Sequence, residues 1–352
     1  VPSSLSTACV ASPARGRLPR LPPAGMLVPL AALATVGADE KGPVVSYLFT
    51  LRRARHPLPR VWSMYFAGCP RGSYKIWLHT DPTFNGTQKT NATNRFFSPD
   101  RMIPHSTHIR RFGYEMVQGR MLLLRHAMSA TSPPPDWYLF FSESCAPITH
   151  CADAHSYLAK AAGKSFMKTR PPPPDEINNT PAWQAAFNTT CPQCAGAGIP
   201  PTDFRYSPGW VGLWREHAQK LLDHEEKYRS AFSNFGYDKL VNGIPDESYW
   251  STLAQHHGMQ LHEALTTYME DGDAKTGHSK MFKEADVARL WNLGPPALFA
   301  RKFATTPALD IALHARLSAS PNAIRTSKQR AEKRAAAAQR RLYATSRAPH
   351  AA

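Results

Sequence analysis

The order of buried-strand and helix patterns between residues 44 and 141 most restricts the folds that this chain can adopt. Apolar runs at 44–51 and 74–81 each end in polar residues, which is typical of parallel strands buried on both faces. Apolar residues then recur at helical spacing over 115–128, before another apolar run at 137–141. Strands that alternate with helices predict an α/β fold with a mostly parallel central sheet flanked by helices.

The strand predicted at 137–141 runs directly into a small polar cluster, "SESC", at 142–145. Pro147 follows and predicts that regular strand pairing ends there. Ligands of open α/β sheets bind beyond the carboxyl ends of the strands, so this junction fits the edge of a binding site. Taken alone, the same stretch is explained more simply as a strand that ends in an ordinary turn.

The chain divides into three parts. Residues 1–42 are rich in Pro, Ala and Arg without periodicity and predict a disordered stem, and the basic, Ala-rich residues 319–352 predict a disordered tail. Between them, 43–318 is expected to form a single domain. Within it, the proline-rich stretch 170–183 predicts a surface loop, and apolar residues at helical spacing over 211–222 predict a second amphipathic helix.

The beginning of the sequence bears on membrane attachment. The chain starts with Val1, and its longest early apolar run, 26–37, is too short to span a bilayer and contains Pro29. Any membrane anchor is therefore expected upstream of this sequence.

The net charge of +16 raises the possibility of nucleic-acid binding. The stretch from Arg325 to Ala352, however, holds eight Lys and Arg residues against the single acid Glu332, so a net +7 belongs to the tail. The remaining charge of about +9 accompanies no helix-turn-helix, RRM or zinc-finger pattern. We therefore expect no nucleic-acid partner, and an acidic or phosphorylated ligand fits the remaining charge equally well.

Cysteines and glycosylation sequons indicate the compartment. Four acceptor sequons lie in polar, turn-rich stretches, at Asn85, Asn91, Asn178 and Asn188, and they indicate luminal or extracellular exposure. The chain has six cysteines, and the "CPQC" stretch at 191–194 lacks a second ligand pair at zinc spacing. It predicts either a local disulfide or free thiols.

Three pairs of polar or charged residues lie where predicted elements begin or end: His79 with Asp81, Asp246 with Glu247, and Arg301 with Lys302. An acidic pair at a helix N-terminus ordinarily caps the helix and stabilises it by under about 1 kcal/mol, and Asp246 is the better placed of its pair to do so. Two cations inside an apolar run are costly to bury, so they either extend to solvent or face an anion.

Taken in order, these stretches resemble the motifs of the Core-2/I-branching family, glycosyltransferase family 14. "YKIWLHTDP", "WYLFFSESCAPIT", "IPDESYWSTLA" and "ALFARKFA" are similar to the family patterns "YxIYVHxDP", "FVLLSESCIPL", "PDExYxxTL" and "LFARKF". The resemblance runs from about Val44 to Leu317 and is closest to the plant-type branch of a family that includes β-1,6-N-acetylglucosaminyltransferases and peptide O-xylosyltransferases. It implies a GT-A-like fold in which the strand ends line a donor and acceptor cleft.

The resemblance also implies roles for individual residues. Inverting glycosyl transfer needs a base for the acceptor hydroxyl and positive charge on the departing nucleoside diphosphate. By their positions in the motifs, Glu247 is the base, Arg301 and Lys302 clamp the diphosphate, and Asp81 contacts uridine. Glu143 and Ser144 line the cleft.

Trp210 is expected to pack at the acceptor site, because it matches the Trp of the family pattern "KGSQW". The match is incomplete, since Pro208 and Gly209 replace the usual pair before it. A tryptophan buried in the core is the alternative interpretation.

The resemblance implies no divalent metal and no other cofactor, because Arg301 and Lys302 supply the positive charge. The one Asp-x-Asp motif, "DGD" at 271–273, lies late in the chain and is interpreted as coincidental. The expected substrates are a UDP-sugar carrying GlcNAc, glucuronic acid or xylose, and a hydroxyl of a glycan or glycoprotein. The expected location is the Golgi lumen, as a single-pass type II membrane protein. A catalytically inactive relative that binds a glycan or nucleotide is the alternative, although Glu247 and both cations favour an enzyme.

Overall fold

A computed structural model describes residues 42–51, 56–82, 96–110, 113–170, 180–234, 244–272 and 279–319 of the chain. Apart from Gly42 and Ala319, the predicted stem and tail lie outside these residues. Among the helices of the described part, none is both long enough and apolar enough to cross a membrane.

The main sheet has six strands in the order β2-β1-β3-β6-β5-β7. The strands are β1 (Val45–Leu51), β2 (Tyr74–Thr80), β3 (Trp137–Ser142), β5 (Ser165–Phe166), β6 (Gly212–Trp214) and β7 (Leu261–His262). β1 is parallel to β2 and β3, whereas β6 is antiparallel to β3 and β5, and β7 is parallel to β5. The predicted α/β class and the three predicted strands are confirmed, and the sheet is mixed beyond β3.

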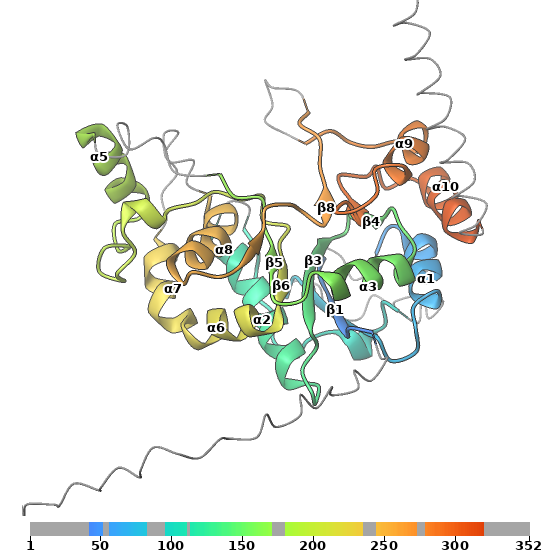
Figure 1. The fold of residues 1–352 in the computed structure, drawn as a ribbon, viewed down its shortest axis with the longest axis horizontal. Coiled ribbons are helices and arrows are strands. Elements are labelled where there is room, and N and C mark those ends of the chain that lie inside the picture. The colour runs from blue at the N-terminus through green and yellow to red at the C-terminus, as the bar shows by residue number, and fades with distance from the viewer. Residues whose placement is uncertain are drawn as a thin grey trace, which may run out of the picture. The chain divides into compact units, whose positions relative to one another are not determined.

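Helices cover both faces of the main sheet (Figure 1). On one face, α1 (Pro59–Ala67) and α3 (Cys151–Lys160) contact the strands, while α10 (Pro307–Ser318) packs on α1 and α9 (Val287–Trp291) adds residues to the same core. On the other face, α2 (Glu115–Ser129), α6 (Arg215–Asp223) and α8 (Pro245–His256) contact the strands, while α7 (Glu225–Ser233) packs against α6 and α8, and α5 (Pro181–Thr190) adds Phe187 to the same core. Short 3-10 helices lie at Pro99–Arg101, Pro201–Asp203 and Glu284–Asp286.

The side chains of β1 explain why its sequence is an apolar run instead of an alternating pattern. Tyr47 and Phe49 pack in the core with Trp62 of α1, while Leu48 points to the opposite core with Met121 of α2. Because both faces of the sheet are covered, both sets of side chains must be apolar.

A second, three-stranded sheet has the order β4-β9-β8, with β4 at Ala146–Pro147, β8 at Thr267–Tyr268 and β9 at Phe299–Ala300. The prediction that Pro147 ends strand pairing is wrong, because Pro147 pairs with Phe299 in an antiparallel ladder. β4 is an edge strand, where a missing N–H group is tolerated. This small sheet places the "ALFARKFA" motif beside the end of β3.

The helix predicted over 211–222 is shorter in the structure. Gly212–Trp214 form β6, inside the main sheet, and α6 begins only at Arg215. The apolar residues before Arg215 belong to a buried strand. Their spacing matched the apolar spacing of the helix that follows only by coincidence. Likewise, the predicted loop at 170–183 ends earlier than expected, because α5 begins at Pro181; residues 171–179 lie outside the described part.

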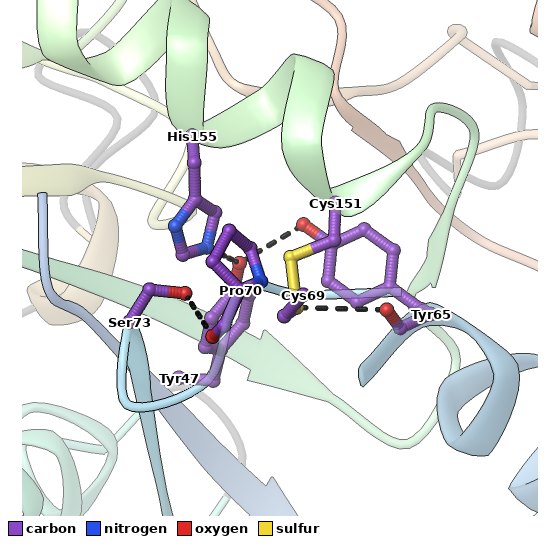
Figure 2. Close-up of a disulfide and its surroundings, with 7 residues drawn as sticks. All are labelled: Tyr47, Tyr65, Cys69, Pro70, Ser73, Cys151 and His155. Atoms are coloured by element: carbon purple, nitrogen blue, oxygen red, sulfur yellow. Dashed lines mark hydrogen bonds between the residues drawn. A yellow bond between two sulfur atoms is a disulfide. The ribbon is translucent and has the colours of Figure 1, made fainter. Parts of the chain in front are cut away.

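A disulfide between Cys69 and Cys151 joins the segment after α1 to the first residue of α3. Figure 2 shows the polar groups beside it: the Tyr47 hydroxyl lies 2.9 Å from the Tyr65 hydroxyl and 3.1 Å from Nε2 of His155. These three side chains are buried and hydrogen-bond to one another, as buried polar groups must.

The "CPQC" stretch closes as a disulfide between Cys191 and Cys194, which confirms the first of the two predicted alternatives. Cys145 is a buried free thiol in the turn after β3. Cys9 lies outside the described residues.

Candidate active site

The polar ends of the central strands lie side by side. The register pairs Thr50 of β1 with His79 of β2 on one side and with Ser142 of β3 on the other. Because these strands are parallel, their carboxyl ends meet at one edge of the sheet. Asp81 follows β2 at this edge, where its Oδ2 atom lies 2.8 Å from Nδ1 of His108.

The turn after β3 is held by its own polar groups. Oγ of Ser142 lies 3.1 Å from Oγ of Ser144, and the backbone N–H of Ser142 lies 3.4 Å from the Cys145 sulfur. The Ser144 carbonyl accepts a hydrogen bond of 3.0 Å from the N–H of Phe303. Ser144 is buried and Glu143 is half-buried on the same turn. The polar cluster therefore fastens the turn to the "ARKF" segment.

The segment that carries Arg301 and Lys302 is held on two sides. The Arg301 N–H donates to the carbonyl of Tyr268 at 2.9 Å, and the Lys302 carbonyl accepts from the N–H of Phe282 at 2.7 Å. Both residues are half-buried. Burial lowers the pKa of Arg301, which is a guanidinium in a poorly solvated environment.

The acidic pair lies in the first turn of α8. Oδ2 of Asp246 is 3.3 Å from Nη2 of Arg120, a residue of α2, and both side chains are almost fully buried. The expectation that Asp246 caps the helix is wrong, because the N-cap position is Ile244 and Asp246 lies inside the first turn. A buried carboxylate is stable only with a partner, and Arg120 supplies the cation, so the Asp246 side chain is used in the tertiary ion pair.

Arg120 is a site residue that the sequence analysis did not identify. It lies in the apolar stripe of α2, three residues after Val117 and four before Leu124, and it is 3% exposed. A charge inside the buried stripe of an amphipathic helix was the available signal, because such a charge requires a partner.

The Trp210 ring contacts both arginines of the site. The Arg301 guanidinium carbon is 3.9 Å from the Trp210 ring centroid, and that of Arg120 is 5.0 Å from it. Trp210 is 8% exposed and belongs to the core on the α1 face of the sheet. The structure thus supports the core interpretation, and it adds cation–π contacts with two cations.

Gly209 allows this close packing. A Cβ atom at this position would lie 2.6 Å from Nη1 of Arg120, 2.8 Å from the carbonyl oxygen of Asp246 and 2.9 Å from its Oδ2 atom. No side chain fits there without displacing the Arg120–Asp246 pair. The departure from the family pattern before Trp210 therefore has a structural reason.

Glu247 is half-buried beside these charges. Burial and the neighbouring Asp246 raise the pKa of its carboxyl group, while a hydrogen bond from Tyr206 and the charges of Arg120 and Arg301 oppose this increase. A carboxylate whose pKa is raised is a stronger base than an ordinary glutamate.

The segment that carries Tyr206 runs along α8. The N–H of Ser207 donates to the Glu247 carbonyl at 2.7 Å, and the N–H of Arg205 donates to the Thr252 hydroxyl at 3.1 Å. The Arg170 guanidinium covers the Tyr206 ring at 5.1 Å from its centroid. These contacts fix the position of the aromatic ring whose hydroxyl reaches Glu247.

Two groups could be considered as metal ligands. One sulfur each of Cys69 and Cys151 and a ring nitrogen of His155 lie within 4.8 Å of one another, but both sulfurs are used in the disulfide. In the "DGD" motif, Asp271 is exposed and pairs with Ser279 in an isolated bridge, and Asp273 lies outside the described residues.

Of the four sequons, only that at Asn188 lies within the described residues, where Asn188 is exposed on α5. Asn85, Asn91 and Asn178 lie outside them.

Comparisons with known proteins give a family and a relative. The sequence model of the Core-2/I-branching enzyme family matches residues 45–290. Glycosyltransferase BC10 of Oryza sativa subsp. japonica is 27% identical over 240 residues, which make up 63% of this chain and 55% of that protein. The chain thus spans little more than half the length of this curated relative.

Two solved structures align over most of the chain. A galactosyltransferase, LgtC, in complex with donor and acceptor sugar analogues, aligns at 9% identity and a TM-score of 0.39, covering 80% of this chain and 99% of that one. Mouse xyloside xylosyltransferase 1 in its apo form aligns at 11% identity and a TM-score of 0.35, covering 73% and 97%. Both TM-scores are too low for the alignments to define the fold.

Proposed function

Because the chain belongs to the Core-2/I-branching enzyme family, we propose that it transfers a sugar from a UDP-sugar to a hydroxyl group of a glycan or glycoprotein, with inversion and without a metal ion. One observation carries this proposal. The Arg301 and Arg120 guanidinium carbons lie 3.9 Å and 5.0 Å from the Trp210 ring centroid, and Arg120 pairs at 3.3 Å with Asp246, the residue directly before Glu247. The fold thus brings Glu247 and Arg301, which lie far apart in the sequence, into one cluster.

These two groups suit the two ends of a single displacement. The acceptor oxygen forms a bond to the anomeric carbon as the bond from that carbon to the UDP oxygen breaks. Glu247 takes the proton of the acceptor hydroxyl, and the electron pair of the broken bond leaves on the diphosphate. Arg301 and Lys302 stabilise that negative charge, which a bound cation would otherwise do.

The other residues of the site support this reaction in the same scheme. Asp81 lies at the same sheet edge, directly after β2, and we assign it to the uridine end of the donor. The turn with Glu143 and Ser144 is hydrogen-bonded to the "ARKF" segment, and we assign these two residues to the lining of the cleft. Since motifs and relative both point to the plant-type branch, glucuronic acid is the donor sugar that we would test first, followed by GlcNAc and xylose.

The experiment that tests the proposal measures UDP release by the purified chain in EDTA. UDP-glucuronic acid, UDP-GlcNAc and UDP-xylose are each offered with and without p-nitrophenyl β-galactoside as an acceptor. We expect acceptor-stimulated release with at least one of the donors. Tight UDP binding with no release from any donor would instead identify a nucleotide-binding relative without activity.

We also propose that the protein works in the Golgi lumen as an N-glycoprotein, because the exposed Asn188 lies in an acceptor sequon. When the chain is secreted from eukaryotic cells, an enzyme that removes N-glycans should lower its mass. Asn188→Gln should remove part of that decrease, whereas the Gln replacement of Asn234, which is not in a sequon, serves as the control. A secreted, folded protein whose mass does not change would contradict this location.

A further inference from the structure

We propose that Arg120 is a positioning residue for the base: through Asp246 it holds the first turn of α8, and it balances the charge next to Glu247. This inference rests on the proposed function, in which Glu247 accepts the proton. Arg120 itself does not need to touch a substrate.

The ion pair between Arg120 and Asp246 is buried. Arg120 is 3% exposed and Asp246 is 6% exposed, and each supplies the other's ion-pair partner in a poorly solvated environment. Asp246 directly precedes Glu247 in the first turn of α8. Fixing the Asp246 side chain against α2 therefore fixes the backbone from which the Glu247 side chain extends.

Aromatic rings pack around the Arg120 guanidinium. Trp210 and Phe140 cover it at 5.0 Å and 5.9 Å from their ring centroids, and Gly209 leaves room for it. Its Nη1 atom is buried and has no hydrogen-bond partner among the described residues. The guanidinium is thus held by rings and by one carboxylate, which permits a single position.

Charged residues around Glu247 affect the pKa of its carboxyl group. The groups that face the Glu247 carboxyl come from four elements: Asp246 from α8 itself, Tyr206 from the segment along it, Arg120 from α2, and Arg301 from the end of β9. Asp246 disfavours the ionised form of Glu247, and Arg120 favours it. Removing Arg120 alone should therefore raise the pKa of Glu247, and removing the charge of Asp246 alone should lower it.

The test reads the titration of Glu247 directly. In protein labelled with carbon-13 at the glutamate carboxyl carbons, the Glu247 signal is the one that is missing from Glu247→Gln. Arg120→Met should raise the pKa of Glu247 by about one pH unit, because a nearby positive charge is lost. Asp246→Asn should lower it by about the same amount, and the double variant should titrate between the two.

Turnover provides the second readout. Glu247 must be ionised to act, so the acid limb of the kcat/KM profile should move to higher pH in Arg120→Met and to lower pH in Asp246→Asn. Arg120→Lys keeps the charge and should restore most of the wild-type limb. Arg125→Met, which removes an arginine of the same helix that pairs with Glu225 and is 52% exposed, should leave the limb unchanged.

Melting and UDP binding show whether each variant is folded. If Arg120→Met does not fold, the double variant Arg120→Met with Asp246→Asn, which removes both charges of the ion pair, is compared with Asp246→Asn alone. The two differ only in Arg120, and the pKa of Glu247 should be lower in the variant that keeps Arg120. Titration of Glu247 at the wild-type pH in all folded variants would overturn the proposal. The titration needs no turnover. A chain without transferase activity would therefore contradict the proposed function, while the titration of Glu247 in the variants would still decide this inference.

Discussion

Glu247→Gln is expected to lower the rate of transfer by a factor of about 10² to 10⁴, because it removes the base that accepts the acceptor proton. Glutamine keeps the shape of the side chain and can still accept a hydrogen bond from Tyr206. The melting temperature and the affinity for UDP should therefore stay close to those of the wild type. In the wild type, burial and Asp246 raise the pKa of Glu247. As the pH is lowered, Glu247 should therefore become protonated, and activity should be lost, at a higher pH than for a solvated glutamate.

The matched control is Glu216→Gln, which changes an exposed glutamate of α6 away from this cluster and should leave turnover unchanged. If Glu247→Gln turned over within a few-fold of the wild type, Glu247 would not be the base. Glu143, on the turn after β3, would then be the next candidate.

Removing the cations should weaken the binding of UDP. Charge-assisted hydrogen bonds to phosphate contribute roughly 1.5–3 kcal/mol each, so Lys302→Ala and Arg301→Met should each weaken UDP binding by at least about tenfold. Arg301→Met also removes the guanidinium that lies over Trp210, and some loss of stability should accompany it. Isothermal titration calorimetry with UDP measures the affinity, and thermal melting measures the stability.

Lys164→Met, at an exposed position, is the control for the loss of one positive charge. Affinities are compared with and without EDTA, since the clamp should work without a divalent ion. Loss of wild-type UDP binding in EDTA would show that the two cations are not sufficient. Asp271 and Asp273 of the "DGD" motif would then have to be considered as metal ligands.

Much of the fold could be predicted because its strands are buried on both faces. The runs that became β1, β2 and β3 contain apolar residues on both sides of the sheet, and such runs are recognisable without knowing their partners. The end of β3 at Ser142 also agrees with the sequence, since the polar residues begin there. The motifs placed Glu247 and Arg301 in one site, and the structure brings them together.

The errors concern contacts between segments that are far apart in the sequence. Asp246 looked like a helix cap because local rules consider only its own helix, whereas its partner, Arg120, comes from α2. Pro147 looked like the end of strand pairing because its partner, Phe299, lies in the last motif of the domain. In both cases the deciding interaction is tertiary, and one sequence does not reveal which distant residue supplies it.

The central claim is that this site catalyses a single displacement with Glu247 as the base. The measurement that tests it most directly is the anomeric configuration of the first product formed from a UDP-sugar in EDTA, read by proton NMR. The account predicts a product of inverted, β configuration, formed with one UDP per sugar transferred and absent with Glu247→Gln. A product that retains the α configuration of the donor, or one formed only when a divalent ion is added, would contradict it.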